Sequence, residues 1–152
     1  MREAGSPVVQ FLQDTGTESR GQTIAEILAL GDNELECRHD YIQWLFPLGE
    51  PSQAVPGSPV LDVSDIEVLT RSAVARRNLA AAADRMRRFY LGNAHWLCPY
   101  DHNHLRITRI ISSLRLLVGD NEADEFRKAM LEQVARSGHP VNARSLAFWA
   151  KA

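Results

Sequence analysis

Five histidines, two cysteines and a large share of arginine are the residue types in this sequence that could do chemistry. His39 falls at helical spacing within an apolar run, with Asp40 beside it and Gln43 one turn further along. A histidine there could act as an acid, a base or a ligand-binding group. It could equally be a buried residue that satisfies both ring nitrogens through its neighbours and fixes helix packing. The residues alone leave both interpretations open, and we give more weight to packing.

A second group of polar residues begins at His102. His102, Arg106, Arg109 and Ser113 share one face of a predicted helix, and Asn103 lies at the border of its apolar stripe. Free N–H groups at a helix N-terminus favour negative charge, so this face would suit a carboxylate or a phosphate. The alternative is an internal clamp, in which the arginines pair with acids of the first half of the chain.

His95, Cys98 and His102 could be written as a zinc motif, H-x2-C-x3-H, because their side chains are ligands that zinc prefers. The spacing matches no known paired-ligand module, and Cys98 precedes a proline. Cys98 beside a histidine could also be a nucleophile, but no oxyanion donor or orienting acid is identifiable. We therefore expect no metal ion, no other cofactor and no catalytic residue here.

The elements that must position these residues are predicted to be helices. Apolar spacing and start and stop signals predict six of them, at residues 23–30, 33–46, 64–92, 101–118, 120–138 and 142 onward. Four prolines and two glycines between residues 47 and 59 predict a loop. Strand pairs with hairpin signals do not occur. The sequence therefore predicts an all-α, compact single-domain bundle of about six helices, with a flexible arm at residues 1–10 and the domain at residues 11–152.

Composition limits the class of protein. The 152 residues, 45% of them hydrophobic, suffice for one globular domain with a real core. Residues 1–70 carry 12 acids and 3 bases, whereas residues 71–152 carry 14 bases and 7 acids. This split either helps two parts of the domain dock or leaves a basic face over Arg71–Arg88 for nucleic acid. The overall pI of about 6.2 argues against a dedicated nucleic-acid binder.

The sequence also shows no recognisable targeting signal. The first seven residues lack the basic-then-apolar run of a signal peptide, and no apolar stretch approaches the roughly 18 residues of a membrane span. We expect a protein without a transmembrane segment, cytoplasmic, or nuclear or perinuclear if eukaryotic, with reduced cysteines.

Two stretches carry a resemblance to a known family. Residues 39–47 read H-D-Y-I-Q-W-L-F-P and residues 102–114 read H-N-H-L-R-I-T-R-I-I-S-S-L. These stretches resemble, in the same order, the two signature blocks of the opioid growth factor receptor conserved region, and the similarity extends over residues 11–149. Arginine outnumbers lysine 15 to 2, as in many GC-rich genomes, so we expect a stand-alone microbial member.

The resemblance implies a binding function. Vertebrate members of the family are described as receptors for the pentapeptide Met-enkephalin that act at the nucleus and carry long C-terminal segments. We predict a non-enzymatic module for a peptide or a small anionic ligand, in which Arg106 meets a carboxylate and Tyr41 or Trp44 supplies stacking area. The predicted ligand-binding residues are His39, Tyr41, Gln43, Trp44, Asn103, Arg106 and Arg109.

That hypothesis places the helices of residues 34–46 and 102–118 at the centre of the fold, so that His39 and Gln43 meet Asn103, Arg106 and Arg109. Two alternatives remain. One is an enzyme, such as a hydrolase that uses His39 as its base. The other is a nucleic-acid-associated protein that uses the basic helix.

Overall fold

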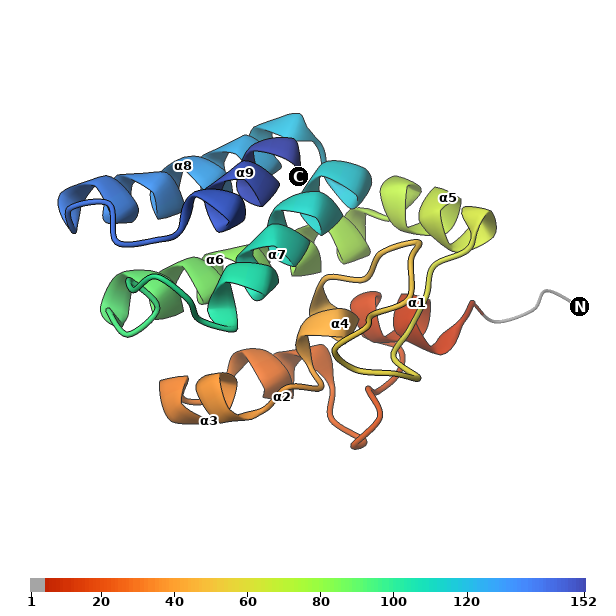
Figure 1. Cartoon of the computed structure of the whole chain (residues 1–152). Coiled ribbons are helices and arrows are strands. Elements are labelled where there is room, and N and C mark those ends of the chain that lie inside the picture. Colours follow the sequence, from red (N-terminus) through yellow and green to blue (C-terminus); the bar gives the residue numbers. More distant parts are fainter. Residues whose placement is uncertain (1–4) are drawn as a thin grey trace, which may run out of the picture. The chain divides into compact units, whose positions relative to one another are not determined.

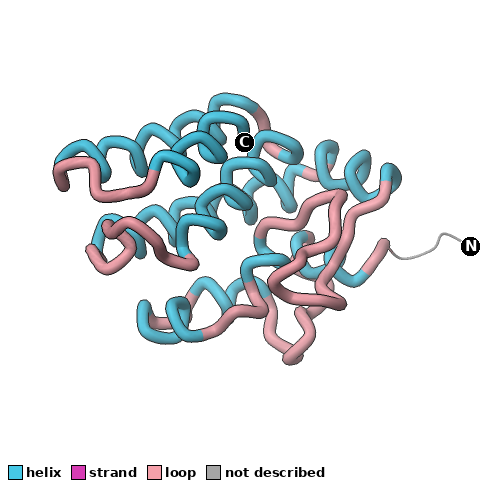
Figure 2. The backbone as a smooth tube through the Cα atoms, in the orientation of Figure 1, coloured by secondary structure: helices cyan, strands magenta, loops and turns pink. Residues whose placement is uncertain are grey.

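The computed structural model describes residues 5–152 and is built from helices and loops (Figures 1 and 2). The helices are α1 (Pro7–Leu12), α2 (Ile24–Leu28), α3 (Asp32–Cys37), α4 (Ile42–Leu45), α5 (Val63–Arg71), α6 (Ala73–Gly92), α7 (Asn103–Leu117), α8 (Asp120–Arg136) and α9 (Ala143–Lys151). No strand occurs within residues 5–152, which confirms the all-α prediction. The helices number nine in this range instead of about six, because α1 was not predicted and two predicted helices are interrupted.

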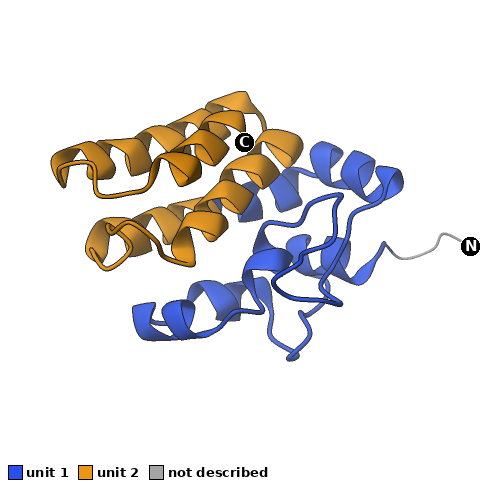
Figure 3. Cartoon of the chain, viewed as in Figure 1, with its two compact units in different colours: residues 1–82 blue, residues 83–152 orange. Residues whose placement is uncertain are grey.

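Two compact units make up the chain, residues 1–82 and residues 83–152, and their boundary falls within α6 (Figure 3). In the first unit α1 packs against α4 and α5, and in the second α7 packs against α8 and α9. Each unit buries large aromatic side chains, among them Phe11 and Phe46 in the first and Trp96 and Trp149 in the second. Of the helices described, none combines the length and the apolar character that a membrane span needs.

The arm predicted at residues 1–10 overlaps α1. Its first four residues lie outside the described part of the chain. From Pro7 onward the chain is helical, with proline in the first turn, where its missing N–H leaves no helix bond unmade. Val8 and Val9 are buried together with Phe11 and Leu12, so this segment contributes to the core of the first unit.

The single helix predicted over residues 33–46 is wrong. α3 ends at residue 37 and α4 begins at residue 42, with Arg38 extended between them (φ −81°, ψ 140°). His39 is therefore exposed in a bend and does not lie on an apolar helix face. Tyr41 is fully buried in the same break, where its hydroxyl donates a hydrogen bond to the Leu35 carbonyl.

Four charged side chains hold this break, and we refer to Glu18, Arg20, Arg38 and Asp40 as the charge cluster. Arg38 donates to Glu18 Oε2 at 3.3 Å and to Asp40 Oδ1 at 3.2 Å, while Arg20 Nε lies 2.6 Å from Asp40 Oδ2. The Glu18 side chain has no exposed surface, and its Oε1 accepts the backbone N–H of Arg20 and of Gln22 at 2.9 Å. These contacts, from residues well before α3, favour an extended Arg38 over a continued helix.

Asp40 makes the stability of the first unit depend on pH. Burial acts to raise the pKa of its carboxyl, but the hydrogen bond and charge of Arg38, with the charge of Arg20, outweigh burial and hold the pKa below the usual range of an aspartate. Such a carboxyl stabilises the fold above its unfolded pKa and loses that contribution as pH falls through its folded pKa. We expect the free energy of unfolding to decrease below about pH 4, and less steeply in Asp40→Asn. Urea unfolding between about pH 3 and pH 6 measures both slopes, and equal slopes would contradict this role for Asp40.

A second interruption divides the helix predicted over residues 64–92. Ser72 is extended, and its hydroxyl accepts the backbone N–H of Ala75 at 3.1 Å, so it ends α5 and caps α6. The helix start predicted at residue 64 moves to Val63, because Asp62 and Asp65 form a capping box directly at that point. Leu61 explains this choice: it is buried and its N–H bonds to the Leu48 carbonyl at 2.9 Å, which fixes the chain directly before Asp62.

The helices of the second unit follow their predicted signals closely. Asp101 Oδ1 accepts the backbone N–H of Asn103 at 2.9 Å at the start of α7. Gly138 has a positive φ of 78° after α8, which only glycine adopts without strain. Asn142 Oδ1 accepts the N–H of Ser145 at 2.8 Å and caps α9. These starts and stops depend on neighbouring residues, so the sequence predicted them well.

Candidate binding site

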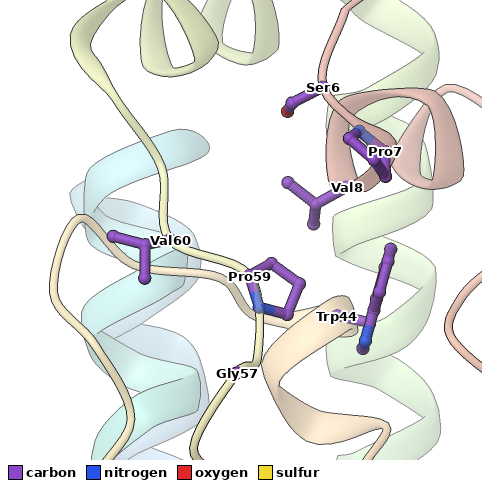
Figure 4. Close-up of a pocket in the computed structure, with 7 residues that line it drawn as sticks. All are labelled: Ser6, Pro7, Val8, Trp44, Gly57, Pro59 and Val60. Atoms are coloured by element: carbon purple, nitrogen blue, oxygen red, sulfur yellow. The ribbon is translucent and has the colours of Figure 1, made fainter.

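An apolar hollow of about 320 Å³ opens on the first unit. Its walls are the start of α1, the short helix α4 and the loop between α4 and α5. Figure 4 shows the residues of these three segments around the hollow. The lining residues are Ser6, Pro7, Val8, Trp44, Gly57, Pro59 and Val60. None of these seven side chains is ionisable, so the hollow can bind an apolar group but supplies no acid or base. We refer to it as the Trp44 hollow.

Local structure explains how these segments come together. Gly57 has a positive φ of 82°, and this glycine conformation lets the loop turn, with the Ser58 N–H bonded to the Val55 carbonyl at 3.2 Å. Leu61 is held to Leu48 across the base of the loop. The loop therefore folds back on itself and presents Pro59 and Val60 to the hollow.

Trp44 provides the aromatic wall of the hollow. Its ring meets Phe11 edge to face, with ring centroids 5.7 Å apart. Phe11 is fully buried, whereas Trp44 is half-buried, so packing fixes the indole while part of it stays accessible. An indole held in this way provides rigid stacking area for an apolar or aromatic group.

One polar atom lies beside the apolar walls. The Ser6 hydroxyl oxygen is buried and has no hydrogen-bond partner among residues 5–152, and Ser6 makes no side-chain cap for α1. Figure 4 shows Ser6 on the side of the hollow next to Pro7 and Val8. Buried hydroxyls are nearly always hydrogen-bonded, so a bound group with a polar atom could satisfy this one.

The first unit holds four of the predicted ligand-binding residues, and they have different surroundings. Trp44 lines the hollow, whereas Tyr41 is fully buried, so its ring is not exposed for stacking. Gln43 is also buried, and its Oε1 accepts no hydrogen bond from the residues described. His39 is exposed in the bend before α4.

The other three predicted residues share α7 in the second unit. Asn103 is fully buried, with its Nδ2 donating to Asp101 Oδ1 at 2.9 Å and its Oδ1 accepting from the Tyr90 hydroxyl at 3.1 Å. Arg106 is buried and Arg109 half-buried, and burial lowers the pKa of the Arg109 guanidinium to about 10. Arg109 thus stays charged at neutral pH. That these three residues join His39 and Gln43 in one site stays a prediction.

Most residues of the hollow were missed by the sequence analysis. Trp44 was found because it belongs to a motif, but Ser6 and Val8 belong to the predicted arm, Pro59 ends the predicted loop and Val60 follows it. The signal that could have found them is the apolar pair Val8–Val9 after a proline, which is typical of a short packed helix. Which loop residues face that helix depends on tertiary packing.

The comparisons with known proteins agree on one family. Residues 11–95 match the family described as the opioid growth factor receptor (OGFr) conserved region. The chain is 36% identical to the opioid growth factor receptors of Rattus norvegicus and Mus musculus over 98 residues, and 35% identical to that of Homo sapiens over 101 residues. Each alignment covers 53% of this chain but only 14–17% of the relative. No solved structure matches the chain.

The family match covers one of the two motifs. The first motif, at residues 39–47, lies inside the family match, and the second, at residues 102–114, lies beyond it. Four of the seven residues that line the Trp44 hollow lie within the matched range, and Ser6, Pro7 and Val8 lie before it. The family similarity therefore bears most directly on the first unit.

Proposed function

The chain belongs to the opioid growth factor receptor conserved-region family, and on this premise we propose that its first unit is a non-enzymatic module that binds a peptide. An apolar or aromatic side chain of the peptide enters the Trp44 hollow and stacks on the indole. One observation carries the proposal: a motif tryptophan, half-buried and fixed by Phe11, forms the wall of an apolar hollow. A tryptophan needed only for the core would be covered, as Trp96 and Trp149 are.

Charge supports a peptide over a small anion. Residues 1–70 carry 12 acids and 3 bases, and no basic side chain lines the hollow. An anion would approach against this net negative charge, whereas a neutral or cationic peptide would not. The named relatives are receptors for opioid growth factor. Because the chain spans only 14–17% of their length, a peptide partner for this chain remains our proposal.

Two exposed valines provide a matched test. Val60 lines the hollow and is 45% exposed, and Val68 on α5 is 41% exposed and does not line it. We expect Val60→Gln to raise the dissociation constant at least about fivefold, since a polar group would replace apolar contact area worth about 1 kcal/mol. Val68→Gln should bind as the wild type does.

Isothermal titration calorimetry checks this expectation with two probes, Met-enkephalin and N-acetyl-phenylalanine amide. The second probe offers one aromatic side chain with neutral backbone groups, which suits an apolar hollow beside the Ser6 hydroxyl. Equal affinities of the two valine variants, or binding of neither probe to the wild type, would refute the peptide site.

A further inference from the structure

A different hollow, of about 470 Å³, opens on the second unit. Its lining includes Tyr100, Leu105, His104, Asn142 and Ser145, the last at the start of α9. The Ser145 hydroxyl oxygen lies 3.5 Å from His104 Nδ1. A serine hydroxyl beside a histidine nitrogen, in an open hollow, is the arrangement that nucleophilic catalysis requires.

The hydrogen bonds around His104 fix its tautomer. His104 is buried, and its Nε2 lies 2.7 Å from the Trp96 carbonyl oxygen. A carbonyl oxygen can only accept, so Nε2 carries the hydrogen of the neutral ring and Nδ1 carries the lone pair. The ring also packs edge to face on Trp149, with centroids 6.0 Å apart, and the Trp149 indole N–H donates to the His104 carbonyl at 3.0 Å. The lone pair is therefore held toward Ser145.

Asn142 fixes the direction of the serine hydrogen. Its Oδ1 accepts the Ser145 backbone N–H at 2.8 Å, so its Nδ2 is the group that lies 2.9 Å from the Ser145 hydroxyl oxygen. Nδ2 donates there and also to the Pro99 carbonyl at 2.6 Å. Since the Ser145 oxygen accepts from Asn142, its own hydrogen is directed to His104 Nδ1. The chain of donors runs from Asn142 through Ser145 to His104 and from His104 to Trp96.

We infer that Ser145 is a nucleophile activated by His104 as general base, with the Trp96 carbonyl in the orienting role that a carboxylate often has. The separation of 3.5 Å is at the long end for a hydrogen bond, as is common for catalytic pairs without substrate. This activity would belong to the second unit and goes beyond the peptide binding proposed for the first.

The reaction is hydrolysis of an ester through an acyl-serine. The Ser145 oxygen attacks the acyl carbon while its proton moves to His104 Nδ1. The bond to the alcohol then breaks, and the alcohol oxygen takes the proton from Nδ1. Water next attacks the acyl carbon and gives a proton to Nδ1, and that proton returns to the Ser145 oxygen as the acid leaves. Water is the one co-reactant.

The lining indicates the class of substrate. Tyr100 and Leu105 are 81% and 66% exposed and provide apolar area beside Ser145. No lysine or arginine lines the hollow, and Asp101 does, so an anionic substrate would find no counter-charge. A small uncharged carboxylic ester with an apolar acyl group fits these surroundings.

A fluorophosphonate probe tests the inference on the full chain. Mass spectrometry of the labelled peptides compares Ser145 with Ser137, an exposed serine at the end of α8, in one wild-type sample. We expect Ser145 to react about 100-fold faster, the usual scale of general-base assistance. His104→Gln, which retains a donor for the Trp96 carbonyl, should remove that advantage.

Hydrolysis of p-nitrophenyl acetate gives an independent measurement. The wild type and Ser137→Ala should release a burst of about one equivalent of nitrophenol, and Ser145→Ala should not. Labelling of Ser145 no faster than of Ser137 would overturn the inference, and so would a burst that persists in Ser145→Ala. The comparison of the two serines needs no variant, so it stands even if His104→Gln does not fold. Either result would leave the peptide site proposed at the Trp44 hollow unaffected.

Discussion

Arg38→Met should lower the free energy of unfolding by about 3–5 kcal/mol, the usual cost of breaking a buried ion pair from one side. The Glu18 carboxylate has no exposed surface, and Arg38 is the basic side chain of the charge cluster that contacts it. Methionine retains the length of the arginine stem but leaves the carboxylate without its counter-charge. Equilibrium unfolding in guanidinium chloride measures the loss.

Arg20→Met is the matched control within the same cluster. The Arg20–Asp40 pair is shorter, at 2.6 Å, than the Arg38–Glu18 pair at 3.3 Å, so distance alone would rank it as stronger. Its side chains are 57% and 26% exposed, however, and exposed pairs contribute only about 0–1 kcal/mol. If Arg20→Met lowers the free energy of unfolding as much as Arg38→Met does, burial does not determine the strength of these ion pairs.

Arg106→Ala should also lower the free energy of unfolding by about 3–5 kcal/mol if the role of Arg106 is architectural. It is 8% exposed on α7, and a buried guanidinium is stable only when other groups satisfy its charge and its hydrogen bonds. Truncation to alanine leaves those groups without their partner. The urea midpoint, measured together with the slope of the transition, gives the change in stability.

Arg88→Ala serves as the comparison for Arg106. The Arg88 side chain is 64% exposed and pairs with Asp84 one helical turn away, at 3.2 Å. Surface changes of this kind shift stability by about half a kcal/mol or less. If Arg106→Ala unfolds like the wild type, the architectural role fails, and a ligand site becomes the better explanation of this arginine.

Helices that start and stop on local signals could be predicted from the sequence. Asn142 caps α9 and Gly138 follows α8 because capping and positive φ depend on residues a few positions apart. The break at Arg38 could not be predicted, since it depends on Glu18, 20 residues earlier. Helical spacing continued through the break, and the pattern therefore predicted one helix where tertiary contacts favour two.

The candidate sites show the same division between local and distant information. Trp44 belongs to a recognisable motif, but its hollow also needs Val8 and Val60 from segments far apart in the sequence. His104 and Ser145 are 41 residues apart, and neither spacing nor periodicity could bring them together. Motifs thus identified single residues, and packing determined which of them line a hollow.

The most direct test of the peptide site is the indole N–H signal of each tryptophan in ¹⁵N-labelled protein during titration with Met-enkephalin. Trp96 and Trp149 are fully buried in the second unit, and their indole N–H groups already donate to backbone carbonyls, so they serve as internal references. Peptide binding at the Trp44 hollow predicts a saturable shift of the Trp44 signal while the other two stay in place. A Trp44 signal that does not move at saturating peptide would contradict it.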